Sequence, residues 1–204
     1  LKFDSRRLIA QDCEMLNTFK YFLPEELRKV VNAESNSWHD ADFIGRIWLK
    51  DASVWTGRDE AKWLGWLDIV GEELADLQKY SDLESDLAAA GFTNTLLMGM
   101  GGSSLCPEVL AMTFGKTNFH ILDSTVPAQV KAVENKLDLA KTLFIVASKS
   151  GSTLEPNCFK QYFFERVAET VGRENAGKQF IAITDPGSKM EQVAKADGFR
   201  HIFY

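Results

Sequence analysis

The sequence has 204 residues, of which 45% are hydrophobic and 25% are charged, and its formal net charge is −6 at pH 7. This length and composition suit one globular α/β domain with an appended helical piece, and the acidic balance argues against nucleic acid, which requires a basic face. No window holds the roughly 18 consecutive apolar residues of a membrane helix, and no secretory signal opens the chain. We therefore expect a cytoplasmic protein that binds neither nucleic acid nor membranes.

The three cysteines predict no metal site. Cys13, Cys106 and Cys158 form neither a CxxC pair nor a Cys/His cluster with zinc spacing. An odd and scattered set of cysteines is typical of reduced thiols in a cytosolic protein.

Residues 1–90 predict a mostly helical region that packs on the core of the protein. Leu67, Val70 and Leu74 recur at helical spacing inside a long charged stretch. All five tryptophans lie between Trp38 and Trp66. We interpret them as packing residues of this region rather than as an aromatic cage for a ligand.

Residues 91–204 predict an α/β domain, because short apolar runs there alternate with helical stretches. The runs are continuous rather than alternating, which favours a parallel sheet covered by helices on both faces. Such sheets have right-handed crossovers and bind ligands at the carboxyl ends of their strands. The runs are 95–98, 119–122, 143–147, 180–184 and 199–204, and the helical stretches between them are 106–115, 128–137, 154–171 and 189–196.

A loop rich in glycine and serine follows the first apolar run and reads Gly-Met-Gly-Gly-Ser-Ser over residues 99–104. Glycines let the backbone turn sharply and let a ligand approach closely. Pro107 is tolerated in the first turn of a helix, which places the helix N-cap at Ser103 or Ser104. Free N–H groups at such a helix start attract an anion.

A second hydroxyl-rich loop follows the third run and reads Ser-Lys-Ser-Gly-Ser-Thr over residues 148–153. Thr153 as the N-cap puts Pro156 in the first helical turn, whereas Ser152 with Glu155 makes a capping box, and the sequence leaves both open. Lys149 adds a full positive charge. Either way, the sequence predicts a second anion-binding loop at the carboxyl end of a strand.

Other interpretations of the two loops are weaker. Ordinary strand-to-helix turns explain each loop alone, but not a matched pair on one sheet. Neither loop has the residue order of a P-loop. Gly99 and Gly101, with Asp123 at the end of the second run, approach the dinucleotide fingerprint. However, Ser104 occupies the third glycine position of that fingerprint, and the loop at 148–153 is left unexplained.

The two loops resemble signatures of the glucose-6-phosphate isomerase family. Residues 99–105 resemble its Gly-Ile-Gly-Gly-Ser signature and residues 148–155 resemble its Ser-Lys-Thr-x-Thr-Thr-x-Glu segment, in the same order and at a similar separation. The resemblance covers 91–204 and implies the first sugar-isomerase (SIS) domain of that family, a doubly wound five-stranded parallel sheet flanked by helices. Residues 45–57 resemble more weakly the isomerase part of bacterial proteins that fuse transaldolase to glucose-6-phosphate isomerase.

The resemblance implies that the ligand is a sugar phosphate, glucose 6-phosphate or fructose 6-phosphate, and that no metal or organic cofactor is needed. Serine at position 150 replaces the family's more usual threonine and keeps the hydroxyl, and Glu155 is interpreted as structural. The residues that the resemblance places at the substrate are Gly101, Gly102, Ser103, Ser148, Lys149, Ser150, Ser152 and Thr153.

The resemblance implies no catalytic residue in this chain, because the family's arginine, glutamate, histidine and lysine lie C-terminal to the matching segment. The start at Leu1 and the strand-like final residues indicate a piece of a longer protein, expected to be a homodimer. We interpret His39, His120, Arg200 and His201 as structural. The alternative function is a regulator with the same fold that senses phosphosugars without chemistry, although the acidic, tryptophan-rich N-terminal region does not resemble a DNA-binding helix-turn-helix.

Overall fold

The structure, a computed structural model, describes residues 22–204. Cys13 and the first part of the helical region predicted for 1–90 lie outside the described residues. The chain divides into two compact units, Leu1–Lys79 and Tyr80–Tyr204, and each is described here by itself.

The described part of the first unit is helical, as the sequence predicts. Its helices are α2 (Glu25–Asp40), α3 (Phe43–Trp48) and α4 (Ile69–Ala75), and three short 3-10 turns (52–54, 60–63 and 65–67) connect α3 to α4. Helix α2 follows Pro24 and carries Glu25 and Glu26 in its first turn, where negative charge favours the helix dipole. Trp38 stacks on Phe43 with 4.9 Å between ring centroids. The packing of this region on the core stays a prediction.

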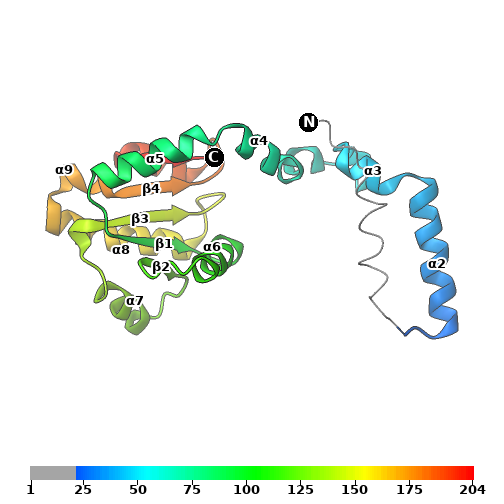
Figure 1. Cartoon of the computed structure of the whole chain (residues 1–204), viewed down its shortest axis with the longest axis horizontal. Helices are drawn as coiled ribbons and strands as arrows, with labels where there is room; N and C mark the ends of the chain where they lie inside the picture. Colours follow the sequence, from blue (N-terminus) through cyan, green and yellow to red (C-terminus); the bar gives the residue numbers. More distant parts are fainter. Residues whose placement is uncertain (1–21) are drawn as a thin grey trace. The chain divides into compact units, whose positions relative to one another are not determined.

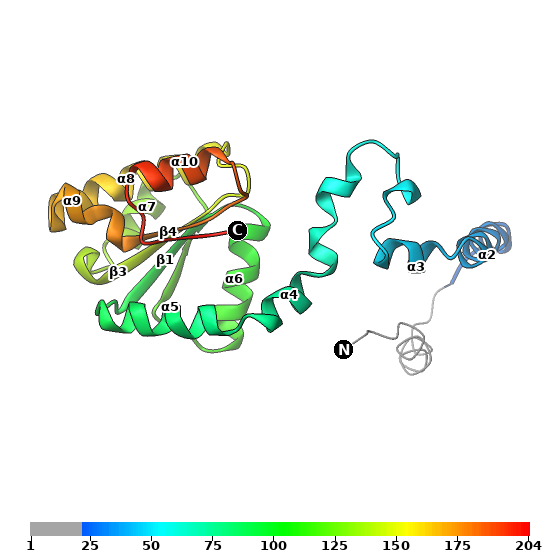
Figure 2. The same cartoon turned by 90° about the horizontal axis from the view of Figure 1, so that it is seen from above.

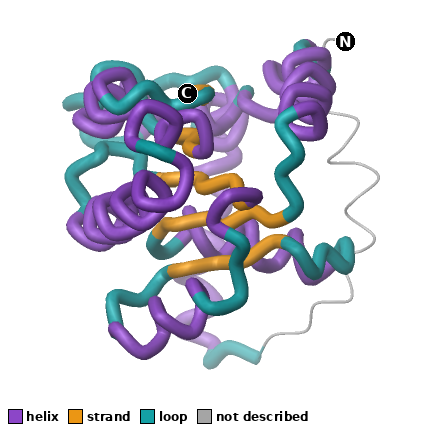
Figure 3. Tube along the Cα trace, turned by 90° about the vertical axis from the view of Figure 1, so that its left-hand side faces the viewer, coloured by secondary structure: helices purple, strands orange, loops and turns teal. Residues whose placement is uncertain are grey.

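The second unit is built on a five-stranded parallel sheet, which confirms the predicted fold class. Its strands are β1 (Asn94–Gly99), β2 (Phe119–Leu122), β3 (Thr142–Ala147), β4 (Phe180–Ile183) and β5 (His201–Phe203). The strands lie in the order β2-β1-β3-β4-β5, with every neighbouring pair parallel. Figure 1 shows β1, β3 and β4 pointing the same way, and Figure 3 shows the strands as one layer. Each predicted apolar run therefore overlaps one strand.

Helices cover both faces of the sheet. Figure 2 shows α5 (Gln78–Ala89) and α6 (Gly102–Thr113) on one side, and α8 (Leu154–Val171), α9 (Arg173–Ala176) and α10 (Lys189–Ala196) on the other, together with α7 (Pro127–Glu134). From β1 the chain moves outward to β2, and from β3 it moves in the opposite direction to β4. The strand order therefore reverses between β1 and β3, and such a switch point opens a crevice at the carboxyl ends of the two strands.

Aromatic side chains pack between α8 and the central strands of the sheet. Phe144 of β3 stacks on Phe180 of β4 with 4.9 Å between ring centroids, and Phe163 of α8 lies 5.4 Å from Phe144. All three side chains are fully buried, and each such pair contributes about 0.5–1.5 kcal/mol beyond its burial. The loop between β3 and α8 is thus held at both ends by packed elements.

A buried carboxylate joins α7 to α8. Glu134 accepts hydrogen bonds from Lys131 (2.7 Å), from the Tyr162 hydroxyl (2.9 Å) and from Arg166 (2.7 Å). Burial raises the pKa of Glu134, but the three donors outweigh burial and lower the pKa from 4.5 to about 2. Glu134 is therefore ionised at neutral pH although it is buried.

The predicted start of α6 is wrong. The N-cap is Gly101, neither Ser103 nor Ser104, and Pro107 lies inside the helix rather than in its first turn. Gly101 has φ +60° and ψ −126°, a conformation that favours glycine, so the chain turns before the serines. Pro107 offers no N–H to the carbonyl of Ser103 four residues earlier.

Candidate functional site

The two predicted loops lie side by side at the switch point. Gly99, the last residue of β1, pairs in register with Ala147, the last residue of β3. A Cβ atom on Gly99 would lie 3.1 Å from the Ser103 Cβ and 3.3 Å from the Ala147 carbonyl oxygen. Glycine at this position thus allows the first loop to pack closely against the end of β3.

The first loop is ordered by its own hydrogen bonds. The N–H of Ser103 donates to the carbonyl of Met100 at 3.2 Å, and the Ser104 hydroxyl donates to the carbonyl of Gly101 at 3.0 Å. Ser104 is buried, whereas Ser103 is half-buried and both Gly101 and Gly102 are exposed. Gly102 is the first helical residue, so its N–H belongs to the group that has no intrahelical acceptor. This part of the loop presents a backbone N–H and a hydroxyl.

The second loop ends at Thr153, which the structure makes the N-cap of α8. Pro156 is then the third helical residue, where it removes no intrahelical hydrogen bond. Thr153 makes no side-chain cap, and the Ser150 hydroxyl instead lies 2.6 Å from the Ser152 hydroxyl and accepts the N–H of Ser152 at 3.2 Å. The alternative capping box from Ser152 is therefore wrong, and three exposed hydroxyls lie within four residues.

Ser148 differs from the other hydroxyl residues of the loop because it is buried. Its side-chain oxygen has no hydrogen-bond partner among the described residues, although its N–H donates to the carbonyl of Ile183 at 3.0 Å. Leaving a buried hydroxyl unpaired costs about 1–3 kcal/mol. Such a group at the carboxyl end of a strand fits a ligand-binding role.

A third loop, which the sequence interpretation missed, supports the second. It joins β4 to α10 over residues 184–188, and Ser188 caps α10 by accepting the N–H of Glu191 at 3.0 Å. Ser188 followed three residues later by Glu191 is the sequence signature of a capping box. The sequence therefore contained a signal for the start of α10. The side chain of Thr184 is buried and contacts the second loop directly.

Arg200 and His201 lie at the other edge of the sheet, at the amino end of β5. Arg200 donates to both carboxylate oxygens of Asp86 at 2.9 and 3.0 Å, and His201 Nε2 lies 2.9 Å from Asp86 Oδ2. The hydrogen bonds from His201 and Arg200 lower the pKa of Asp86. These contacts tie α5 to β5 and support the interpretation of both residues as structural.

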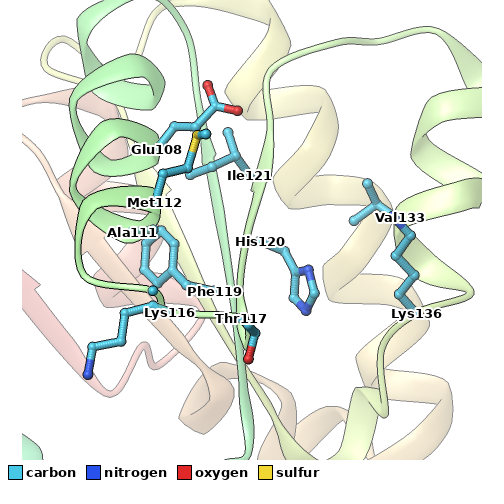
Figure 4. Close-up of a pocket in the computed structure, with 11 residues that line it drawn as sticks. Glu108, Ala111, Met112, Lys116, Thr117, Phe119, His120, Ile121, Val133 and Lys136 are labelled. Atoms are coloured by element: carbon cyan, nitrogen blue, oxygen red, sulfur yellow. The ribbon is translucent and has the colours of Figure 1, made fainter.

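A groove of about 430 Å³ crosses the edge strand β2, away from both loops. Figure 4 shows the ring of His120 in it, with Lys136 extending from the α7 side and Lys116 at the end of α6. His120 Nε2 lies 3.4 Å from Asn94 Oδ1. Burial, and after it the charge of Lys136, lower the pKa of His120, which favours the neutral form of the ring. The groove contains none of the eight predicted site residues.

Two further properties concern the described residues only. Between residues 22 and 204 no group of three or more His, Cys, Asp or Glu side chains is placed to hold a metal ion. None of the helices in that range has the length and apolar character needed to cross a membrane.

Comparison with known sequences identifies relatives of the chain. The glucose-6-phosphate isomerase of Gloeothece citriformis is 39% identical over 181 residues, which cover 83% of this chain and 32% of the relative. That of Prochlorococcus marinus is 30% identical over 175 residues, 78% of this chain and 31% of the relative. This chain is homologous to a part of the glucose-6-phosphate isomerases. It spans 31–32% of the length of these two isomerases.

Solved structures agree with this relationship. A glucose-6-phosphate isomerase from Chlamydia trachomatis superposes with a TM-score of 0.56 at 25% identity, covering 78% of this chain and 29% of that chain. A hypothetical protein from Thermus thermophilus gives a TM-score of 0.69 at 24% identity over 87% of this chain and 40% of its own, which supports the fold alone. No protein-family model matches the chain.

Proposed function

We propose that this chain forms the phosphate-binding part of an isomerase that interconverts glucose 6-phosphate and fructose 6-phosphate. The observation that carries the proposal is the meeting of two hydroxyl-rich loops at the β1/β3 switch point, where the buried Ser148 hydroxyl lacks a partner among the described residues. The relationship to glucose-6-phosphate isomerases supplies the substrate class.

In this proposal each loop contributes donors to one phosphate group. The hydroxyls donate to phosphate oxygens, Lys149 contributes its backbone N–H and its positive charge, and the glycines keep the backbone close to the ligand. Hydrogen bonds to a charged group are worth about 1.5–3 kcal/mol each. The proposed binding residues are Gly101, Gly102, Ser103, Ser148, Lys149, Ser150, Ser152 and Thr153.

The proposed reaction moves a proton between C2 and C1 of the sugar through an enediol. It requires an acid/base for ring opening, a base for the carbon-bound proton and a positive group for the developing oxyanion. Phosphate contacts hold substrate and transition state alike and do not lower the chemical barrier. Because the family's arginine, glutamate, histidine and lysine lie C-terminal to the segment that this chain resembles, we place the catalytic groups outside this chain. The proposed full-length protein is a cytoplasmic homodimer that needs no cofactor. The fusion to transaldolase stays a prediction.

Thermal unfolding of the chain with added ligands tests the proposed function. Glucose 6-phosphate and fructose 6-phosphate should raise the melting temperature, because a ligand that binds only the folded state stabilises it by about 2.7 kcal/mol at 100 times its Kd. Glucose without phosphate, NAD and NADP should leave it unchanged. A shift with NAD and none with fructose 6-phosphate would replace the proposal with the dinucleotide interpretation.

A further inference from the structure

Hydrogen bonds to its carbonyl oxygens hold the second loop, residues 148–153, in place. The N–H of Asp185 donates to the carbonyl of Lys149 at 2.9 Å. The Thr184 hydroxyl lies 2.7 Å from the carbonyl of Ser148 and 3.1 Å from that of Lys149. The side-chain amide of Asn157 donates to the carbonyls of Gly151 at 2.9 Å and Thr153 at 2.7 Å. Two side chains thus bind four carbonyls of a six-residue loop.

The direction of these bonds fixes the direction of the loop's N–H groups. A trans peptide is planar, so its C=O and the following N–H point in opposite directions. When Thr184 holds the carbonyls of Ser148 and Lys149 on the inner side, the N–H groups of Lys149 and Ser150 point away from the protein interior. Asn157 holds the carbonyl of Thr153 in the same way, so the N–H of Leu154 points away from that carbonyl, whereas the N–H of Ser152, after Gly151, donates to the Ser150 hydroxyl at 3.2 Å. Successive N–H groups aimed at one side form a concave anion-binding nest.

The hydrogens of this network can be assigned from its geometry. The single proton of Thr184 serves the loop carbonyls, so the Ser188 hydroxyl, 2.7 Å away, must donate to the Thr184 oxygen. Ser188 accepts in turn the N–H of Glu191 at 3.0 Å, which leaves its own proton available for Thr184. The cap of α10 and the second loop therefore form one chain of hydrogen bonds through Thr184.

We propose that Thr184 is a positioning residue for phosphate binding, with Asn157 as a second one. They do not touch the ligand but hold the loop at 148–153 so that the N–H groups of Lys149 and Ser150, and of Leu154 at the start of α8, turn toward it. This inference rests on the proposed function. The side chain of Thr184 is only 4% exposed, so it acts from beneath the loop. Neither residue belongs to the eight assigned to the substrate.

The test compares Thr184→Val with a control variant that also loses a hydrogen bond from a buried threonine hydroxyl to a backbone carbonyl, at a position away from the loop. Thr142 is also buried, and its hydroxyl donates to the carbonyl of Asp138 at 2.7 Å, so Thr142→Val matches the cost to folding. The affinity of the 204-residue chain for glucose 6-phosphate should fall about tenfold in Thr184→Val, as expected for misdirected donors to a charged group. It should change less than about twofold in Thr142→Val, and Thr184→Ser should restore binding.

Asn157 has its own matched control. Asn175 likewise donates to the carbonyl four residues earlier, Val171, at 3.1 Å. Asn157→Leu should weaken glucose 6-phosphate binding severalfold, whereas Asn175→Leu should leave it unchanged. Equal losses in Thr184→Val and Thr142→Val, or full affinity in Thr184→Val, would overturn the proposal.

A measurement without ligand separates this inference from the proposed function. Backbone amide NMR shifts of residues 149–154 should change in Thr184→Val and not in Thr142→Val. Unchanged shifts in Thr184→Val would overturn the positioning role whatever the chain binds. If the wild-type chain bound no sugar phosphate but these shifts did change, the loop contact would stand and the proposed function would fall.

Discussion

A Cβ atom on Gly151 would lie 2.1 Å from the backbone nitrogen of Met190. Gly151 belongs to the second loop and Met190 to the first turn of α10, so the loop and the helix backbone are in direct contact here. Gly151 also has φ +66°, a conformation that other residues adopt with strain. Two independent constraints therefore require glycine in the middle of the loop.

Gly151→Ala should destabilise the protein and displace the loop. Strain at a left-handed position costs about 1–2 kcal/mol, and overpacking against a backbone that cannot yield adds about 1–3 kcal/mol. Gly115 provides the control, because it has φ +61° but no atom within 4 Å of an added Cβ. Denaturant unfolding should show a clearly larger loss for Gly151→Ala than for Gly115→Ala. Equal losses would mean that α10 gives way without cost.

Ser148→Ala should separate ligand binding from stability. The Ser148 hydroxyl has no partner among the described residues, so its removal should leave the free energy of unfolding unchanged or raise it by up to about 1 kcal/mol. The affinity for glucose 6-phosphate should fall at least about tenfold. Ser104 is also buried but donates to Gly101, so Ser104→Ala should cost about 1 kcal/mol of stability. Unaltered affinity in Ser148→Ala would remove this hydroxyl from the site.

Glu134 should make stability depend on pH below neutrality. Its pKa is about 2 in the folded protein against 4.5 as a reference, so the ionised form stabilises folding above pH 4.5 and the benefit is lost as pH falls toward 2. Glu134→Gln should lower the free energy of unfolding at pH 7 by on the order of 2–3 kcal/mol, and the difference from wild type should shrink between pH 5 and pH 3. Glu169 pairs with the same Arg166 but is exposed, so Glu169→Gln should change stability by less than about 1 kcal/mol at every pH.

The 204-residue chain alone should show no measurable conversion of fructose 6-phosphate to glucose 6-phosphate in an assay coupled to glucose-6-phosphate dehydrogenase. Loss of acid/base and oxyanion groups typically costs factors of about 10² to 10⁴ each. The full-length protein should convert fructose 6-phosphate readily. If the protein is a non-catalytic sensor, neither the 204-residue chain nor the full-length protein will convert it. Turnover by the chain itself would place catalytic groups within residues 1–204, and His39, His120, Arg200 and His201 would be the first to substitute.

The architecture was predictable because its signals are local. Continuous apolar runs such as 143–147 are typical of strands buried on both faces, and each predicted run became a strand of a parallel sheet. The two loops were visible because hydroxyl residues and glycines follow directly after β1 and β3. The N-cap at Thr153 was one of two alternatives from the sequence, and the structure decided between them.

What the sequence did not predict depends on backbone conformation or on long-range contacts. The start of α6 is fixed by the positive φ of Gly101, and the sequence, which offers three glycines at 99, 101 and 102, does not show which of them adopts it. Thr184 contacts carbonyls 35 and 36 residues earlier in the chain, and nothing near it in the sequence marks that role. Ser188 and Glu191 did carry a recognisable signal for the N-cap of α10. That signal does not indicate that the loop at 184–188 contacts the loop at 148–153.

The pairing of Gly99 with Ala147 also bears on how the protein folds. These residues lie roughly fifty positions apart in the chain. Bringing them together loses conformational entropy before the contacts between them contribute any stabilisation. Helices α6 and α7 and strand β2 all lie between them in the chain. Neither loop faces its counterpart until the β1–β3 ladder has formed, so the two loops can act on one ligand only after the slow, non-local step of folding is complete.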